Sequence, residues 1–168
     1  MILFLPIYEI IVGVISFVLG YLTHRFNLLA QYQTLFLLIG AVLLIVALLS
    51  LFLLIRKRGF KNYLKSLIDT NRLRNFLRQQ KVISDFTSKT KVDINLNIYN
   101  SALHYTYIDY FPDHVDISIC IPNNVTAKKI LDGNLKSAEQ EFKLYTTTYI
   151  ISACKPENRY YHYHGEKK

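Results

Sequence analysis

The sequence predicts an α+β protein with an N-terminal two-helix transmembrane hairpin and a small β-rich domain that contains a short helix. Three observations support this prediction. Residues 35–55 carry no charge over 21 positions. The entire net charge of +8 falls within residues 56–81. Beyond residue 91 the apolar residues alternate with polar ones, which is the strand period. We therefore expect a hairpin over 1–55, a basic helical segment over 56–83 and an α+β domain over 84–168.

The two apolar runs are expected to form membrane-spanning helices at about 2–22 and 35–55. A run of about 20 apolar residues is long enough to cross a bilayer as a helix. A cleaved signal peptide is the alternative for the first run. It fits poorly, because no Lys or Arg precedes the run and no small-residue cleavage site follows it.

Basic residues at the ends of these runs predict the orientation of the hairpin. The connection between the two helices carries only Arg25, whereas Arg56, Lys57 and Arg58 follow the second helix directly. Because Lys and Arg accumulate on the cytoplasmic side, we expect a multi-pass protein of the inner membrane with both termini in the cytoplasm.

Glu9, Gly13, Ser16 and Gly20 interrupt the first apolar run at helical spacing. At 100° per residue they fall within about 60° of one another on a helix. Small residues let helices approach closely, and an acid within the membrane usually faces protein or a water-filled path. Two interpretations stay open: a packing seam between the helices, with Glu9 reaching the headgroups, or the lining of an oligomeric pore.

The segment after the hairpin is strongly basic and helical in pattern. Residues 56–81 hold nine Lys and Arg and one acid. The apolar phase changes near Asp69 to Asn71, where a kink or a new helix start is expected because these are N-cap residues. Such a segment attracts anionic lipids at about 1 kcal/mol per basic residue. The alternative is that part of it binds a phosphorylated ligand or nucleic acid.

The C-terminal domain is expected to hold five strands and one short helix. Asn123 or Asn124 is expected near the N-cap of the helix and Gly133 just past its end. The remaining runs alternate or are rich in Tyr, Thr and Ile, which favours strands. The expected strands are 92–98, 103–110, 115–121, 142–153 and 159–164.

No motif indicates catalysis or a cofactor. The sequence lacks a Gly-rich phosphate loop, His-Glu-x-x-His, Cys-x-x-Cys and Gly-x-Ser-x-Gly. His162 and His164 share a face if their segment is a strand, as do His114 and Asp116. Solvent-exposed surface pairs explain both better than a metal or catalytic site does, so we expect no enzyme, no metal and no cofactor.

The candidate ligand contacts come from basic and aromatic residues. The chain has 13 Tyr and no Trp. Tyr side chains on a sheet suit base stacking, although Tyr is also an ordinary strand residue. Phosphate contacts are expected from Arg72, Arg74, Arg78 and Lys81, with Lys128 and Lys129 behind them, and base contacts from Tyr105, Tyr107 and Tyr161.

The order of these parts resembles the small membrane effectors of prokaryotic antiviral defence. The resemblance lies in "EIIVGVISFVLG", "LFLLIGAVLLIVALLSLFLLIRKR" and "VDINLNIY…VDISICI", in that order. One such group is the two-transmembrane ancillary effectors of type III CRISPR systems, which respond to cyclic tetra-adenylate. Another is the strand-rich, two-transmembrane effectors of cyclic-oligonucleotide signalling against phage. The resemblance is one of layout and transfers no residue identities.

This resemblance implies a homo-oligomer whose cytosolic domains bind a cyclic oligonucleotide between subunits and disrupt the inner membrane. Anionic lipids are a second expected partner, and double-stranded nucleic acid is not expected. A non-enzymatic structural component of a membrane secretion or conjugation complex is the alternative, in which the β-rich domain binds a protein partner.

Overall fold

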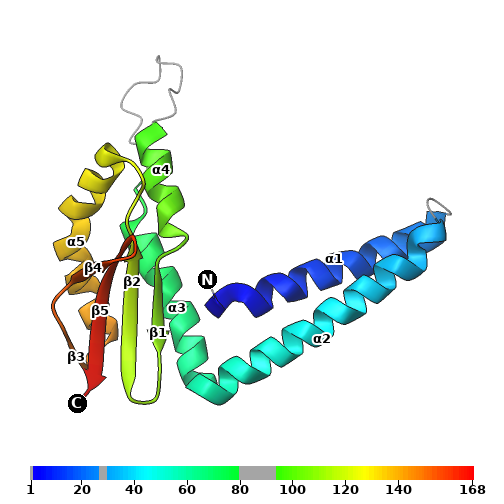
Figure 1. The fold of residues 1–168 in the computed structure, drawn as a ribbon, viewed down its shortest axis with the longest axis horizontal. Coiled ribbons are helices and arrows are strands. Elements are labelled where there is room, and N and C mark those ends of the chain that lie inside the picture. Colours follow the sequence, from blue (N-terminus) through cyan, green and yellow to red (C-terminus); the bar gives the residue numbers. More distant parts are fainter. Residues whose placement is uncertain (1, 27–29, 80–93) are drawn as a thin grey trace. The chain divides into compact units, whose positions relative to one another are not determined.

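The computed structural model describes residues 2–26, 30–79 and 94–168 and divides the chain into two compact units (Figure 1). The first unit is Met1–Phe60 and the second is Lys61–Lys168. Both helices and an antiparallel sheet are present, so the α+β class is confirmed.

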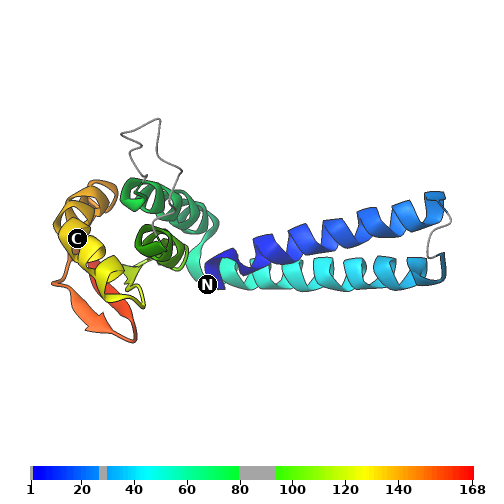
Figure 2. The same cartoon turned by 90° about the horizontal axis from the view of Figure 1, so that it is seen from above.

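The first unit is a hairpin of two long apolar helices. Helix α1 spans Leu5–Phe26 after the 3-10 turn η1 (Ile2–Phe4), and α2 spans Gln33–Arg58 after the 3-10 turn η2 (Ala30–Tyr32). Figure 2 shows the two helices side by side. Leu5–Thr23 and Gln33–Arg58 are long and apolar enough to cross a membrane. Their large apolar side chains mostly point outward, as in helices that contact lipid.

The two helices approach each other closely along a line of small residues. Gly13, Gly40 and Ala47 are all buried in the hairpin. A Cβ atom added at Gly40 would lie 2.9 Å from Cδ2 of Phe17 and 3.2 Å from the backbone oxygen of Gly13. A side chain at Gly40 would require the Phe17 ring and the α1 backbone to shift, so a glycine allows the closest approach.

Gly40→Leu is expected to destabilise the hairpin, because the added side chain collides with Phe17 and the α1 backbone. Overpacking of this kind costs about 1–3 kcal/mol. Thermal unfolding of the detergent-solubilised chain, followed by circular dichroism, measures the effect. Ala41→Leu is the matched control, since Ala41 is exposed on the same helix. Equal unfolding temperatures for the two variants would contradict the close approach at Gly40.

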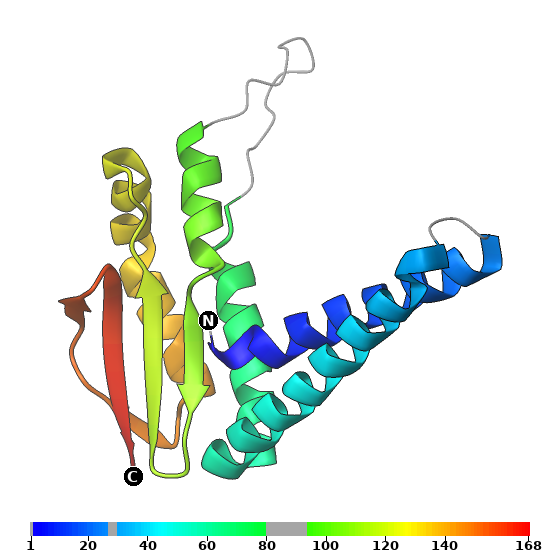
Figure 3. The same cartoon turned by 45° about the vertical axis from the view of Figure 1, so that its right-hand side comes forward.

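The second unit is a five-stranded antiparallel sheet with three helices on one face (Figures 2 and 3). Strands β1, β2, β5 and β3 follow one another in the sheet, and β4 also pairs with β5. The helices are α3 (Phe60–Leu77), α4 (Ile94–Leu103) and α5 (Val125–Tyr145). The strands are β1 (Tyr107–Tyr110), β2 (His114–Cys120), β3 (Tyr149–Ile151), β4 (Lys155–Glu157) and β5 (Tyr160–Lys167).

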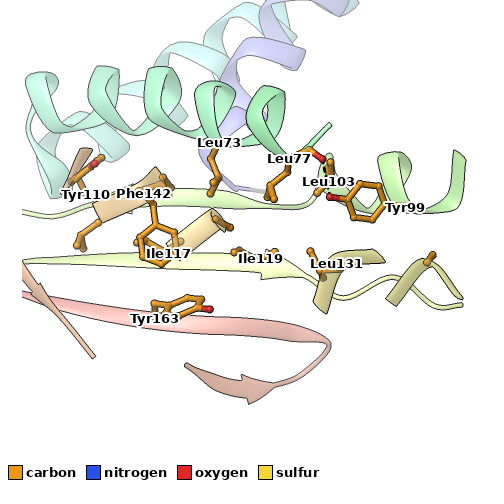
Figure 4. Packing of buried hydrophobic residues seen from close by; sticks show 14 residues of the cluster. Leu73, Leu77, Tyr99, Leu103, Tyr110, Ile117, Ile119, Leu131, Phe142 and Tyr163 are labelled. Atoms are coloured by element: carbon orange, nitrogen blue, oxygen red, sulfur yellow. Dashed lines mark hydrogen bonds between the residues drawn. The ribbon is translucent and has the colours of Figure 1, made fainter. Parts of the chain in front are cut away.

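The core lies between the sheet and the three helices (Figure 4). Alternate residues of β1, β2 and β5 point toward the helices, and each helix contributes a buried stripe. Burial of such side chains is the main driving force for this packing. The labelled members are Leu73, Leu77, Tyr99, Leu103, Tyr110, Ile117, Ile119, Leu131, Phe142 and Tyr163.

The strand predicted at 92–98 is wrong, because residues from Ile94 onward form α4. The same residues also fit the spacing of an apolar helix face, in addition to strand alternation. Leu96, Tyr99 and Leu103 are spaced by three and four and pack in or against the core, while Ile94 is exposed. The tertiary contacts of this helical stripe therefore override the local β-propensity. The strand expected at 103–110 shortens to β1 for the same reason.

The break predicted near Asp69–Asn71 is also wrong, because α3 continues through it. The polar side chains in this region face the edge strand β1. Thr70 Oγ1 accepts a hydrogen bond from the Ile108 N–H at 2.9 Å and donates to the Ile108 carbonyl at 3.2 Å. Ser66 Oγ accepts from the Tyr110 N–H at 2.9 Å. This polar stripe satisfies the outer edge of the sheet, which would otherwise be open to other strands.

Helix α5 is much longer than the short helix that was expected. Asn124 is its N-cap, as predicted, and accepts a hydrogen bond from the Ala127 N–H at 3.0 Å. Gly133, however, lies within the helix and does not end it. Ala138 and Phe142 extend the buried stripe, so the strand expected at 142–153 shrinks to β3. The strands predicted at 115–121 and 159–164 are confirmed as β2 and β5.

Gly133→Ala is expected to stabilise the second unit. A glycine inside a helix costs about 0.5–1 kcal/mol relative to alanine, and a Cβ atom at Gly133 meets nothing within 4 Å. Chemical denaturation should therefore show a higher midpoint for this variant. Gly165→Ala is the contrasting control, since its Cβ would lie 2.6 Å from Ile151 Cδ1. Destabilisation by Gly133→Ala would contradict the helical conformation at that position.

Candidate ligand-binding pocket between α3 and α4

A polar pocket of about 300 Å³ lies between the C-terminal half of α3 and helix α4. Its lining holds two arginines, four asparagines, a serine and a histidine, with one leucine. None of these lining residues is a carboxylate, so the pocket has a positive charge. The lining residues are Asn71, Arg74, Asn75, Arg78, Asn97, Asn100, Ser101, Leu103 and His104.

Two sets of hydrogen bonds hold the walls of the pocket together. The Tyr99 hydroxyl of α4 donates to the carbonyl of Leu77 at 2.8 Å, at the end of α3, where helical carbonyls lack partners. Asn100 accepts from the Gln79 N–H at 3.2 Å and donates to the Gln79 carbonyl at 2.9 Å. Burial raises the pKa of Tyr99, so its hydroxyl remains a donor at neutral pH.

The two arginines are four residues apart, with Arg74 in the last turn of α3 and Arg78 directly after its end. Arg74 Nε donates to the Thr106 carbonyl at 2.7 Å, just before β1, and this bond fixes its guanidinium at the pocket wall. Arg78 follows at the end of α3 with an exposed side chain. Guanidinium groups in this arrangement recognise phosphate or carboxylate through paired hydrogen bonds.

The asparagines give the pocket a second kind of chemistry. Each amide offers both donors and an acceptor, and such a group pairs with the donor and acceptor edge of a nucleobase. Asn71, Asn75 and Asn97 are exposed to solvent at the pocket. The arrangement can therefore hold a small anion that also carries hydrogen-bonding edges. A volume near 300 Å³ lies at the lower end of small-molecule sites.

The structure separates the predicted phosphate contacts. Arg74 and Arg78 line the pocket. Arg72 does not, because its side chain lies in another direction and its Nη1 is 3.3 Å from Asp69 Oδ1. Lys81 lies outside the described residues. Of the four phosphate contacts predicted in this segment, Arg74 and Arg78 thus line the same pocket.

Lys128 and Lys129 lie in the first turns of α5 with exposed side chains. They are not among the lining residues. Sequence reasoning also missed every lining residue that α4 contributes. The signal that was available is the density of asparagine between residues 95 and 100, "NLNIYN".

The predicted base contacts lie away from the pocket lining. Tyr105 is exposed just before β1. Tyr107 packs against Tyr160 with ring centroids 6.3 Å apart. Tyr161 donates its hydroxyl to Asp132 at 2.7 Å, and burial together with this bond raises the pKa of Tyr161 to about 12. Tyr161 packs against the core, so the predicted contribution of these tyrosines to one site with Arg74 and Arg78 does not appear in a single chain.

The expected strand faces are confirmed: His114 and Asp116 share a face of β2, and His162 and His164 share a face of β5. The two faces adjoin, because β2 pairs with β5. His164 Nδ1 lies 2.7 Å from Asp116 Oδ1, and His114 Nε2 lies 3.7 Å from Asp116 Oδ2. Ser118 Oγ and His162 Nδ1 are 2.9 Å apart. Among the described residues, no group of three or more His, Cys, Asp or Glu is arranged to hold a metal ion.

The stripe on α1 faces α2 within the hairpin. A Cβ at Gly13 would meet Leu44 at 3.2 Å, and one at Gly20 would meet Leu37 at 3.0 Å. Ser16 is buried, and its hydroxyl donates to the Val12 carbonyl at 3.0 Å. Glu9 Oε2 is buried with no hydrogen-bond partner among the described residues. Gly13 and Gly20 therefore pack against Leu44 and Leu37 of α2, as expected for a packing seam between the two helices.

Comparisons with known proteins give no relative for this chain. No protein family, curated protein or solved structure matches it.

Proposed function

We propose that this chain is a membrane effector of antiviral defence whose second unit binds a cyclic oligonucleotide, with cyclic tetra-adenylate favoured. The observation that carries the proposal is the α3–α4 pocket, with two arginines, four asparagines and no carboxylate in its lining. The apolar hairpin would anchor the protein in the inner membrane, with both termini in the cytoplasm. Ligand binding would then disrupt or permeabilise that membrane.

The chemistry of the pocket fits one nucleotide unit of such a ligand. Arg74 and Arg78 would contact the phosphate, because charge-assisted hydrogen bonds to guanidinium are among the strongest available. Asparagine amides would contact the adenine edge, which presents one donor beside one acceptor. Asn71 and Asn75 from α3 and Asn97 from α4 are the side chains placed to do so.

The size of the pocket supports binding by several subunits together. About 300 Å³ suits one small-molecule-sized group. A ring of four nucleotides is several times larger, so one pocket would hold only part of it. Symmetric binding of the ring by identical pockets then requires a homo-oligomer, which is the commonest kind of soluble assembly as well.

Helix α3 supplies a route from the ligand to the membrane. It carries Arg74, Arg78 follows its last residue directly, and only Gly59, with φ of 83°, separates it from α2. Because helices transmit displacement as rigid elements, a shift of α3 on ligand binding would act directly on the end of α2. We propose this as a binding and switching function without catalysis.

Isothermal titration of the full chain in nanodiscs tests the proposal. The ligands are cyclic tri- and tetra-adenylate and cyclic dinucleotides, with AMP as the control for a single nucleotide. We expect saturable binding of a cyclic oligonucleotide that is tighter than binding of AMP. Heats indistinguishable from buffer dilution for every cyclic ligand would refute the proposed function.

A further inference from the structure

A second groove, of about 520 Å³, lies between α3 and the C-terminal end of α5. Three large apolar side chains of the groove are exposed to solvent: Leu64 is 41%, Ile68 52% and Leu144 69% exposed. Three cationic side chains stand beside these residues. The groove is lined by Lys61, Leu64, Lys65, Ile68, Asp69, Arg72, Leu144 and Tyr145.

The one carboxylate of this groove is already satisfied within the fold. Asp69 is buried and accepts a hydrogen bond from the Tyr110 hydroxyl at 2.9 Å. Its second oxygen lies 3.3 Å from Nη1 of Arg72. Lys61 and Lys65 therefore leave the groove with a net positive charge toward solvent. Lys65 Nζ lies 4.3 Å from the centre of the Tyr110 ring, which orients it beside the apolar residues.

This combination of apolar and cationic residues selects an occupant that is amphipathic and anionic. An anionic phospholipid has both properties, and basic amphipathic helices bind such lipids at the interface with their apolar face inserted. In the sequence, the groove residues of α3 follow the second apolar helix closely. Lys61 follows Arg58, the last residue of α2, by three positions, and Ile68 lies about 12 Å along α3 from Phe60, its first residue.

We infer that the α3–α5 groove binds anionic phospholipid at the cytoplasmic leaflet, with Leu64, Ile68 and Leu144 inserted among the lipids and Lys61, Lys65 and Arg72 on their headgroups. The inference rests on the membrane anchoring in the proposed function and does not depend on the nucleotide. It assigns α3 two separate faces, one for the soluble ligand and one for lipid.

Single tryptophan reporters test the inference, because the chain has no Trp of its own. Leu144→Trp and Ile68→Trp place a reporter in the groove. Val125→Trp is the matched control, since Val125 is 74% exposed at the opposite end of α5. Leu38→Trp reports on the hairpin, where Leu38 is 61% exposed. Each full-length variant is reconstituted in vesicles that contain brominated lipid, with and without one-third phosphatidylglycerol.

Bromine quenches tryptophan only on contact, so quenching identifies lipid. We expect strong quenching of the two groove reporters in vesicles with phosphatidylglycerol, weak quenching without it, and none of the Val125→Trp reporter. Combining Lys61→Gln, Lys65→Gln and Arg72→Gln should remove most of the quenching at Leu144→Trp. Each lost cation weakens the lipid contact about fivefold.

Three results would overturn the inference. The first is quenching at the groove no greater than at Val125→Trp while Leu38→Trp is quenched. The second is a blue-shifted but unquenched groove reporter, which would show that protein covers the groove instead of lipid. The third is an unquenched Leu38→Trp reporter, which refutes the membrane anchoring itself and the inference with it.

Discussion

Arg78→Gln is expected to weaken cyclic oligonucleotide binding about 10- to 100-fold, because a hydrogen bond to a charged group contributes about 1.5–3 kcal/mol. Arg78 lines the α3–α4 pocket and its side chain is exposed. Its loss should therefore change the stability of the fold little, as is usual for exposed positions. Isothermal titration of wild type and variant gives the ratio of dissociation constants.

Arg72→Gln is the matched control, since it removes the same charge six residues earlier in the chain. Arg72 faces the α3–α5 groove and is not among the residues that line the pocket. Its variant should bind the nucleotide within about twofold of wild type and should instead reduce lipid quenching at Leu144→Trp. If both variants lose nucleotide affinity equally, the effect is one of overall charge, and the pocket is not the site.

Thr70→Val is expected to destabilise the second unit by about 2–4 kcal/mol. The two side chains have the same shape, so packing is preserved, but valine cannot hydrogen bond. Thr70 is fully buried and bonds both the N–H and the carbonyl of Ile108. Each buried backbone group left without a partner costs about 1–3 kcal/mol. Urea denaturation of the full chain in mild detergent, followed by circular dichroism, measures the loss.

Thr126→Val provides the comparison for this change. Thr126 is exposed in the first turn of α5, so the same substitution there should alter the unfolding free energy by less than about 0.5 kcal/mol. A Thr70→Val variant as stable as Thr126→Val would show that α3 does not close the edge of β1. Exposed strand edges are sites of aggregation, so reduced solubility of Thr70→Val is a further expected consequence.

The sequence predicts best those helices and strands whose apolar pattern is simple and uninterrupted. The helices α1 and α2 follow from length and apolarity alone. Strand β2 follows from the alternation of Val115, Ile117 and Ile119, which lie in the core, with polar residues, and β5 follows from a segment rich in Tyr. Local pattern and tertiary burial agree in the two strands, which is the condition under which sequence patterns are informative.

The errors arise where a side chain serves a tertiary contact that no local pattern reveals. Ser66 and Thr70 face β1 and give α3 a buried polar stripe, which in the sequence alone has the pattern of a change of phase. In α4, Ile94 and Ile98 mimic strand alternation, while Tyr99 supplies the helical contact with the end of α3. These residues act through partners more than 20 positions away.

The candidate site was half predictable for the same reason. Arg74 and Arg78 were predicted because charge is visible in any conformation. Asn97 was not, because its contribution depends on α4 being a helix that packs beside α3. Tyr161 was assigned to the ligand, although its place in β5 directs it toward α5, where it binds Asp132.

Ligand-triggered dye release tests the central claim most directly. The full chain is reconstituted in vesicles loaded with a self-quenching dye, in an orientation-independent assay with cyclic tetra-adenylate added on both sides. We expect release that rises with ligand concentration, requires about 10- to 100-fold more ligand for Arg78→Gln and follows the wild-type curve within about twofold for Arg72→Gln. Vesicles that stay sealed at ligand concentrations shown by titration to saturate the protein would contradict it.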